Sequence, residues 1–295
     1  MKYKLLIFAI ILTIVAGGCH KKPAPIVITP DIEKSHLQRN HIFGTVRNIQ
    51  TFTYYVAEDS LTLADTSRIE QILSERTADF SFWQRYSADG FLMHFTKFNP
   101  QKDTLLRQVY YYNWKAKLVR WEESDSTGEI ITRGKYFYDR NDFLSGEQIF
   151  QGDSIVMAFT YTTDGIGNVI KSTQSFGNYT THTENSYNEF GLVDKICEYE
   201  PNGKLFKTVT IEYDNYGDEV NRCVYKSGNQ MVEYTYNQYN QEGRQIKTIY
   251  EDKLHHNKET TLYFNYDKNN NWQTEVKVKD NQIISIRKRK IIYYQ

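Results

Sequence analysis

The chain has 295 residues, with 36 basic and 36 acidic side chains, 24 tyrosines and a mean hydropathy of −0.64. This balanced charge argues against a nucleic-acid partner, which would call for a basic surface. A hydrophilic chain so rich in tyrosine predicts a thin core, built largely of rings whose hydroxyl groups stay near water.

Residues 1–18 are predicted to be a lipoprotein signal peptide. Lys2 and Lys4 precede an apolar stretch from Leu5 to Val15, and three small residues lead to Cys19. At about 1.5 Å per residue this stretch is too short to cross a hydrocarbon layer about 30 Å thick, so it is read as an export signal. The ending resembles the lipobox of bacterial lipoproteins, which implies that Cys19 is acylated, for example with palmitate. The alternative is an ordinary secretory signal that ends in Cys.

Residues 19–40 are predicted to be a tether. Pro23, Pro25 and Pro30 fall within eight residues, and such a stretch favours extended, semi-rigid backbone. In similar lipoproteins an Asp after the lipidated Cys holds the protein in the inner membrane. His20 stands at that position, which favours the outer membrane. The basic residues that follow favour a periplasm-facing protein over one on the cell exterior.

A tyrosine-anchored motif, Tyr-[Asp/Asn]-x-x-[Gly/Asn/Asp]-x-[apolar], recurs through the domain predicted for residues 41–295 and is regular from about residue 80. Successive anchors lie 24 to 27 residues apart. A period of this size marks a repeat array, whose units must pack against their neighbours. The anchors are Tyr86, Tyr112, Tyr138, Thr163, Tyr187, Tyr213, Tyr239 and Tyr266.

Each repeat is predicted to be one long antiparallel β-hairpin. In the repeat at Tyr213, residues 208–213 and 218–225 alternate between polar and apolar types, as half-buried strands do. Asp214 to Gly217 supply a turn, and a second polar turn follows at residues 226–230. The predicted fold is therefore all-β: an antiparallel meander of hairpins that forms one curved, elongated sheet or an open β-repeat array.

Outside the regular repeats, three further elements are predicted. Residues 41–55 alternate well enough to be an opening strand. Between Asp65 and Arg76, the apolar spacing permits one short helix. The last strand, Lys290 to Gln295, is predicted to be the closing edge of the array. The basic run from Arg287 to Lys290 would alternate between the two faces of a strand, which favours a solvated or edge-protecting role over a binding patch.

Several segments resemble a known family. Residues 186–191, 212–217 and 264–272 look like the Tyr-Asp (YD) repeats of Rhs and teneurin-type proteins, and still more like short YD-repeat lipoproteins of the Bacteroidetes. Residues 43–49 are similar to the start of those lipoproteins. The resemblance implies a hairpin-repeat sheet without enzymatic activity. The step is longer than in Rhs shells and Ala116, Asp142 and Asn270 replace the turn glycine, so closure into a hollow shell is not expected.

Candidate metal and redox sites are sparse. Cys197 and Cys223 occupy the same register in successive repeats. Strands that pair in sequence order would hold them about 9 to 10 Å apart as free thiols, whereas directly stacked strands would let them bridge. The first arrangement is favoured. His255 and His256 are adjacent and do not converge, and one Asx side chain per turn serves the hairpin better than a calcium site. No metal or cofactor is therefore predicted.

Three functions remain as alternatives. The preferred one is a membrane-anchored, non-catalytic scaffold or recognition surface for another envelope protein, with the lipid bilayer as its partner through the acyl anchor. The second is a glycan-binding module, in which the regular aromatics Tyr86, Tyr112 and Tyr138 face the ligand. The third is a hydrolase without nominated residues. No Ser, His and acid arrangement carries a nucleophile signature, so the protein is predicted not to be an enzyme.

Overall fold

The computed structural model describes residues 36–40, 42–56 and 61–295. The predicted signal peptide, Cys19 and most of the predicted tether lie outside these residues. Within these residues there are two helices and eighteen strands. Their order is α1 (His36–Arg39), β1 (Val46–Tyr55), α2 (Thr66–Glu75), β2 (Phe80–Tyr86), β3 (Leu92–Phe98), β4 (Thr104–Tyr112), β5 (Leu118–Ser124), β6 (Ile130–Tyr138), β7 (Leu144–Gln151), β8 (Ser154–Thr163), β9 (Val169–Phe176), β10 (Tyr179–Tyr187), β11 (Val193–Tyr199), β12 (Leu205–Tyr213), β13 (Glu219–Lys226), β14 (Gln230–Tyr239), β15 (Gln245–Asp252), β16 (Asn257–Tyr266), β17 (Trp272–Lys279) and β18 (Gln282–Tyr293).

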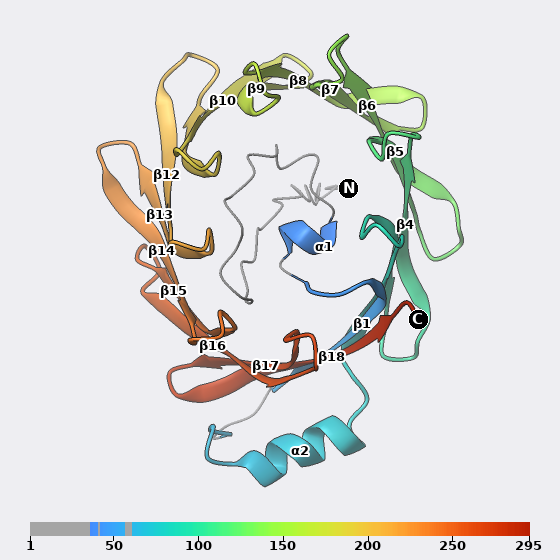
Figure 1. The fold of residues 1–295 in the computed structure, drawn as a ribbon, viewed down its shortest axis with the longest axis vertical. Coiled ribbons are helices and arrows are strands. Elements are labelled where there is room, and N and C mark those ends of the chain that lie inside the picture. The colour runs from blue at the N-terminus through green and yellow to red at the C-terminus, as the bar shows by residue number, and fades with distance from the viewer. Residues whose placement is uncertain (1–35, 41, 57–60) are drawn as a thin grey trace, which may run out of the picture.

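The strands form one closed barrel. Each strand from β2 to β18 pairs antiparallel with the next, and β1 pairs with both β18 and β2. Figure 1 shows the resulting ring. The prediction of an open, elongated sheet is wrong, because the amino-terminal strand fills the gap between the two ends of the array. Closure leaves no row of unpaired N–H and C=O groups, which is the liability of any open sheet.

The predicted closing edge is wrong for the same reason. Residues 290–293 belong to β18, and Lys290 pairs with Gln50 of β1. The short helix is confirmed as α2 and the opening strand as β1. Cys197 on β11 and Cys223 on β13 are separated by β12, and both are free, as predicted.

The hairpins end at two different rims. The motif turns, such as 113–117 and 214–218, form the motif rim. The second turns, such as 125–129 and 200–204, form the far rim. In Figure 1 the motif turns curl inward over the lumen, whereas the far-rim turns flare outward. The barrel therefore has two unlike openings.

The motif itself builds the inward turns. The Asp214 carboxylate accepts hydrogen bonds from the N–H groups of Tyr216 at 2.8 Å and Asp218 at 3.0 Å. The fourth residue after the anchor has positive φ: 82° at Gly217, and 58° at Ala116, which replaces the glycine. Asp142 and Asn270 do the same at 63° and 67°. Loss of the glycine therefore does not stop the turn, because the Asx side chain holds it.

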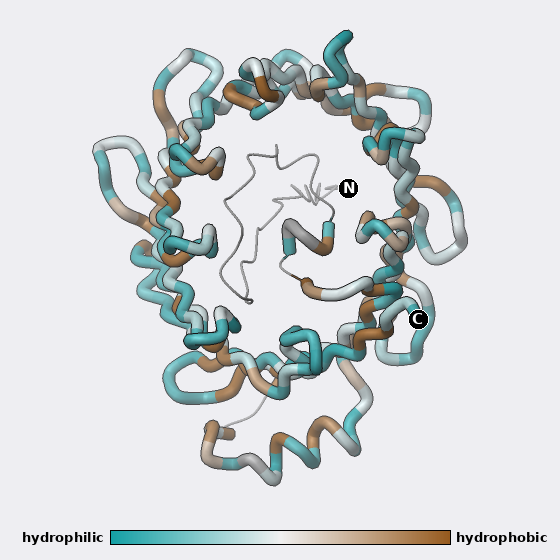
Figure 2. The backbone as a smooth tube through the Cα atoms, in the orientation of Figure 1, coloured by the Kyte–Doolittle hydropathy of each residue, from teal (hydrophilic) through white to brown (hydrophobic). Residues whose placement is uncertain are grey.

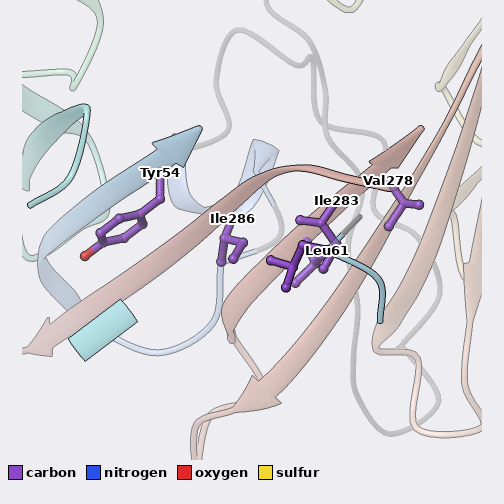
Figure 3. Packing of buried hydrophobic residues seen from close by; sticks show 6 residues of the cluster. Tyr54, Leu61, Val278, Ile283 and Ile286 are labelled. Atoms are coloured by element: carbon purple, nitrogen blue, oxygen red, sulfur yellow. The ribbon is translucent and has the colours of Figure 1, made fainter. Parts of the chain in front are cut away.

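Two small apolar clusters mark the two faces of the wall. Inside, Leu37 of α1 packs with Val46, Ile49 and Tyr86, and Figure 1 shows α1 within the ring. Outside, the connection between β1 and β2 carries α2 over the wall. There Tyr54, Leu61, Val278, Ile283 and Ile286 are buried together, as Figure 3 shows. The core is thin and concentrated where β1 joins the array.

Candidate functional site in the barrel lumen

The outer wall is polar well away from the rims. Side chains alternate between faces along each strand, so the register that places Trp121 inside puts Arg120 and Glu122 outside. These two pair at 3.5 Å, and Lys171 pairs with Glu184 at 3.1 Å on β9 and β10. Figure 2 shows hydrophilic and hydrophobic segments interspersed around the ring. Such a wall does not suit direct contact with hydrocarbon, which requires a continuous apolar band.

No helix among the residues that the structure describes is long and apolar enough to cross a bilayer.

The lumen wall next to β1 carries a charged and aromatic cluster. The Arg289 guanidinium lies 3.5 Å from the centroid of the Trp272 ring, and Tyr263 lies 5.5 Å from the same ring. Arg287 pairs with Glu275 at 3.2 Å, and the Glu275 side chain is buried. Burial lowers the pKa of Arg289 to about 10, so this group remains cationic at neutral pH. The cluster uses its charges to hold β17 and β18 together.

The register confirms that the side chains of the basic run, Arg287 to Lys290, alternate between the two faces of β18. Arg287 and Arg289 face the lumen, while Lys288 and Lys290 face outward beside Phe52 and Gln50 of β1.

A second buried network lies across the lumen on β5 to β8. The Tyr161 hydroxyl donates to the Glu147 carboxylate at 3.2 Å, and Tyr136 and Trp121 also donate to Glu147. Burial raises the pKa of Glu147, and these donors partly offset the rise. Trp121 lies flat over Gly134, where an added Cβ would stand 2.1 Å from the indole nitrogen. The Glu147 carboxylate is therefore surrounded by side-chain donors. We interpret this network as structural, because it links neighbouring strands of the wall.

The anchor tyrosines hold neighbouring hairpins together. The Tyr112 hydroxyl donates to the Leu92 carbonyl at 2.8 Å, and Tyr138 donates to Leu118 at 2.8 Å. The acceptor is the sixth residue after the preceding anchor. We call this contact the tyrosine clasp. It recurs at Tyr187 to Val169, Tyr213 to Val193, Tyr239 to Glu219 and Tyr266 to Gln245.

The three nominated ligand-facing aromatics therefore have structural contacts. Tyr86 is 1% exposed, and Tyr112 and Tyr138 are half-buried with their hydroxyls in clasps. Lys117 also lies over the Tyr138 ring, 5.3 Å from its centroid. The repeated motif predicts equivalent positions for these rings, but by itself it does not predict their carbonyl acceptor. The constant spacing of the anchors could have predicted this contact, because it places each hydroxyl one hairpin away from the same turn position of the preceding repeat.

The amino-terminal segment docks inside the motif rim. The Leu37 N–H donates to the Gly90 carbonyl at 3.2 Å, and the Leu92 N–H donates to His36 Nδ1 at 3.3 Å. Asn271 then binds Phe43 twice, accepting from its N–H and donating to its carbonyl, each at 2.9 Å. His36, Leu37 and Phe43 are thus bonded to turns on opposite sides of β1. These hydrogen bonds hold the start of the described chain at a defined place on the motif rim.

In residues 36–40, 42–56 and 61–295, no group of three or more His, Cys, Asp or Glu side chains is placed to hold a metal ion. His255 pairs with Asp252 at 2.6 Å in a far-rim turn, and His256 has a φ of 49° there. In the motif turns, the Asx oxygen accepts two backbone N–H groups, as at Asp164 and Asn188, and so supports the turn.

The chain matches no protein-family model and no curated protein sequence. Among solved structures it is similar to porin-like proteins from Bacteroides uniformis and Bacteroides vulgatus, each at 11% identity. The first covers 84% of this chain and 98% of that one with a TM-score of 0.44; the second covers 65% and 92% with 0.37. A chain of the TcdB2-TccC3-Cdc42 structure shows 11% identity and a TM-score of 0.35 over 79% of this chain, which spans only 16% of that chain. At such scores these likenesses decide nothing about ligand or partner.

Proposed function

We propose that this protein is a YD-repeat lipoprotein of the Rhs and teneurin type, a lipid-anchored, non-catalytic scaffold of the cell envelope. Its barrel presents the far rim to another envelope protein. The observation that carries the proposal is the group of exposed apolar side chains on most of the far-rim hairpins, all except β13–β14 between β3 and β16.

The far rim carries a series of exposed apolar side chains; the motif turns carry four, at Trp114, Ile166, Phe190 and Tyr216. Large apolar side chains are normally exposed singly, and a gathering of them marks an interaction surface. At the far rim, Ile155 is 52% exposed, Tyr179 57% and Phe206 47%. The full set spans the hairpins from β3 to β16 and comprises Leu105, Ile130, Ile131, Ile155, Phe176, Tyr179, Leu205, Phe206 and Leu254. Because these hairpins flare outward in Figure 1, a partner can reach them without entering the lumen.

The docked amino-terminal segment supports an orientation. Leu37 and Phe43 bind the motif rim, and Cys19 lies seventeen residues before His36. A tether of that length spans at most about 60 Å. The lipid anchor would therefore hold the motif rim toward the outer membrane and leave the far rim pointing into the periplasm.

The glycan alternative is less well supported. It requires exposed ladder rings, and Tyr86, Tyr112 and Tyr138 instead pack and bond within the wall. A non-catalytic role remains the proposal, because the half-buried Glu147 and the buried Glu275 both have structural partners.

Site-specific photo-crosslinking in cells tests the proposal. A photoreactive residue at Phe176, Phe206 or Ile155 is expected to trap one protein of the same mass. The matched positions Thr173 and Thr208, on the outer wall of β9 and β12, are expected to trap none. Adducts that form equally at wall and rim, or no adduct at any rim position, would contradict the proposed recognition surface.

A further inference from the structure

The outer wall holds a sizeable concave site beneath helix α2, on the face of the wall opposite to the lumen. Helix α2 stands off the wall and leaves a cleft of about 760 Å³ over β1, β16, β17 and β18. That volume lies within the range of about 300 to 1,000 Å³ typical of small-molecule sites. The cleft is thus large enough for a ligand rather than a few waters.

One part of the cleft is apolar. Phe52 lies two residues before Tyr54 on the outward face of β1, and Leu73 of α2 faces them. Tyr54 is 6% exposed, while Phe52 and Leu73 are half-buried, so ring and methyl surface remains open to the cleft. Burial of this apolar surface would contribute to the affinity for a ligand but would not fix the orientation of the ligand.

The other part is cationic. Lys288 and Lys290 lie two residues apart on the outward face of β18, which sets them about 7 Å apart along the strand, and Lys288 is paired directly with Phe52. Both are exposed. Within the described part of the chain, neither has a carboxylate partner at ion-pair distance. Among the residues that the structure describes, Glu70 is the one acidic side chain that lines the cleft, so the two lysines give this lining an excess of positive charge.

Polar groups also line the cleft. Thr274 is buried, and its hydroxyl accepts from the Asn265 amide at 3.2 Å. Asn265 has a φ of 53° within β16. A non-glycine residue with positive φ has a strained backbone, and such residues are found more often at ligand sites. The Asn265 side chain reaches Thr274 of β17 at the cleft wall.

We propose that this cleft binds an amphipathic anion, with its apolar body against Phe52, Tyr54 and Leu73 and its carboxylate or phosphate between Lys288 and Lys290. The two charges on one strand face suit a group with several acceptor oxygens, and the adjacent rings suit an acyl or aryl body. Neither the envelope partner nor the lipid anchor proposed above is involved in this site.

Calorimetric titration of the purified full chain with dodecanoate, below its micelle concentration, tests the proposal. Saturable binding is expected, with dodecanol and acetate each at least tenfold weaker, because one lacks the anion and the other the chain. The same titration with dodecyl phosphate distinguishes the two head groups. If dodecanol binds as well as both anions, or if none of them binds, the proposal is wrong.

Variants locate the site. The double substitution Lys288→Gln, Lys290→Gln is expected to weaken dodecanoate binding at least tenfold and to remove its salt dependence. The matched control Lys195→Gln, Lys258→Gln removes two exposed lysines from the outward faces of β11 and β16 and should bind as the parent does. Equal weakening in both doubles would indicate a nonspecific effect of charge and overturn the assignment. Thermal melts establish that both doubles fold.

Discussion

The hydroxyl of Tyr294 donates a 2.7 Å hydrogen bond to the carbonyl oxygen of Tyr86, 208 residues earlier in the chain. It forms a further tyrosine clasp, between the two ends of the array, whose acceptor is an anchor residue rather than the sixth residue after one. The same seam is held by Asn271, which also donates to the Tyr293 hydroxyl at 2.9 Å. Closure of the barrel therefore uses the same chemistry as its repeats.

Replacement of Tyr294 by Phe is expected to lower the free energy of unfolding by about 1 to 2 kcal/mol, because the Tyr86 carbonyl loses its side-chain donor. Urea denaturation measures the change. Tyr179→Phe is the matched control, since Tyr179 is 57% exposed, and it should change stability by less than about 0.5 kcal/mol. Equal effects would mean that the clasp contributes nothing specific.

Thr163 is the one anchor that cannot form a clasp. Its acceptor in the pattern would be the carbonyl of Leu144, which pairs with Tyr138 across the preceding turn. Thr163→Tyr is expected to stabilise the barrel by about 1 kcal/mol through a new hydrogen bond. Thr163→Phe separates the ring from the hydroxyl. If Phe stabilises as much as Tyr, packing rather than the clasp explains the gain.

Ala116 occupies the turn position that is usually glycine, with a φ of 58°. Because this conformation costs an L-residue roughly 1 kcal/mol, Ala116→Gly is expected to raise stability by about 0.5 to 1 kcal/mol. Ala158→Gly, within β8, should have the opposite sign, since glycine weakens a strand. A destabilised Ala116→Gly protein would show that turn strain is not the controlling effect.

Asp218 is expected to make stability depend on pH. It is 8% exposed, and burial, with the nearby Asp214 carboxylate, raises its pKa to about 7 from an ordinary value of 3.8. The folded state therefore keeps its proton where the unfolded chain has lost it. Stability contributed by this proton is full below about pH 4 and is lost as pH rises to about 7.

Asp218→Asn keeps the shape and removes the titration, and Asn already stands at the same turn position as Asn168 and Asn271. The variant is expected to be more stable than the parent at pH 8, by on the order of 2 to 4 kcal/mol, and similar near pH 4. Denaturation curves across this range measure the difference. A constant difference at every pH would exclude titration of Asp218 as its cause.

Cys19→Ala is expected to release the protein from membranes, because it removes the site of the proposed acyl anchor. Fractionation of cells into membrane and soluble parts reads this out, and Cys197→Ala is the control that leaves the anchor intact. Membrane association that persists in the Cys19 variant would count against lipidation.

Local chemistry made much of the architecture predictable. Period-two alternation around Tyr213, with Asp214 beside it, specifies strand, turn and strand within a few residues, and the structure has β12 and β13 there. The alternation of Arg287 to Lys290 likewise follows from strand geometry alone. The candidate binding features were less accessible, since the cleft needs α2, β1 and β18 together, and the far rim needs its hairpins side by side.

The sequence by itself determined the repeating hairpin, its turns and the place of α2, because these depend on neighbours within about 25 residues. Only the tertiary structure decided that the array closes. That outcome depends on β1 meeting both β2 and β18, and so on pairs such as Val46 with Tyr293. Closure depends on the small twist between neighbouring strands, added over all the strand pairs of the barrel. The sequence of a single repeat does not reveal this accumulated twist.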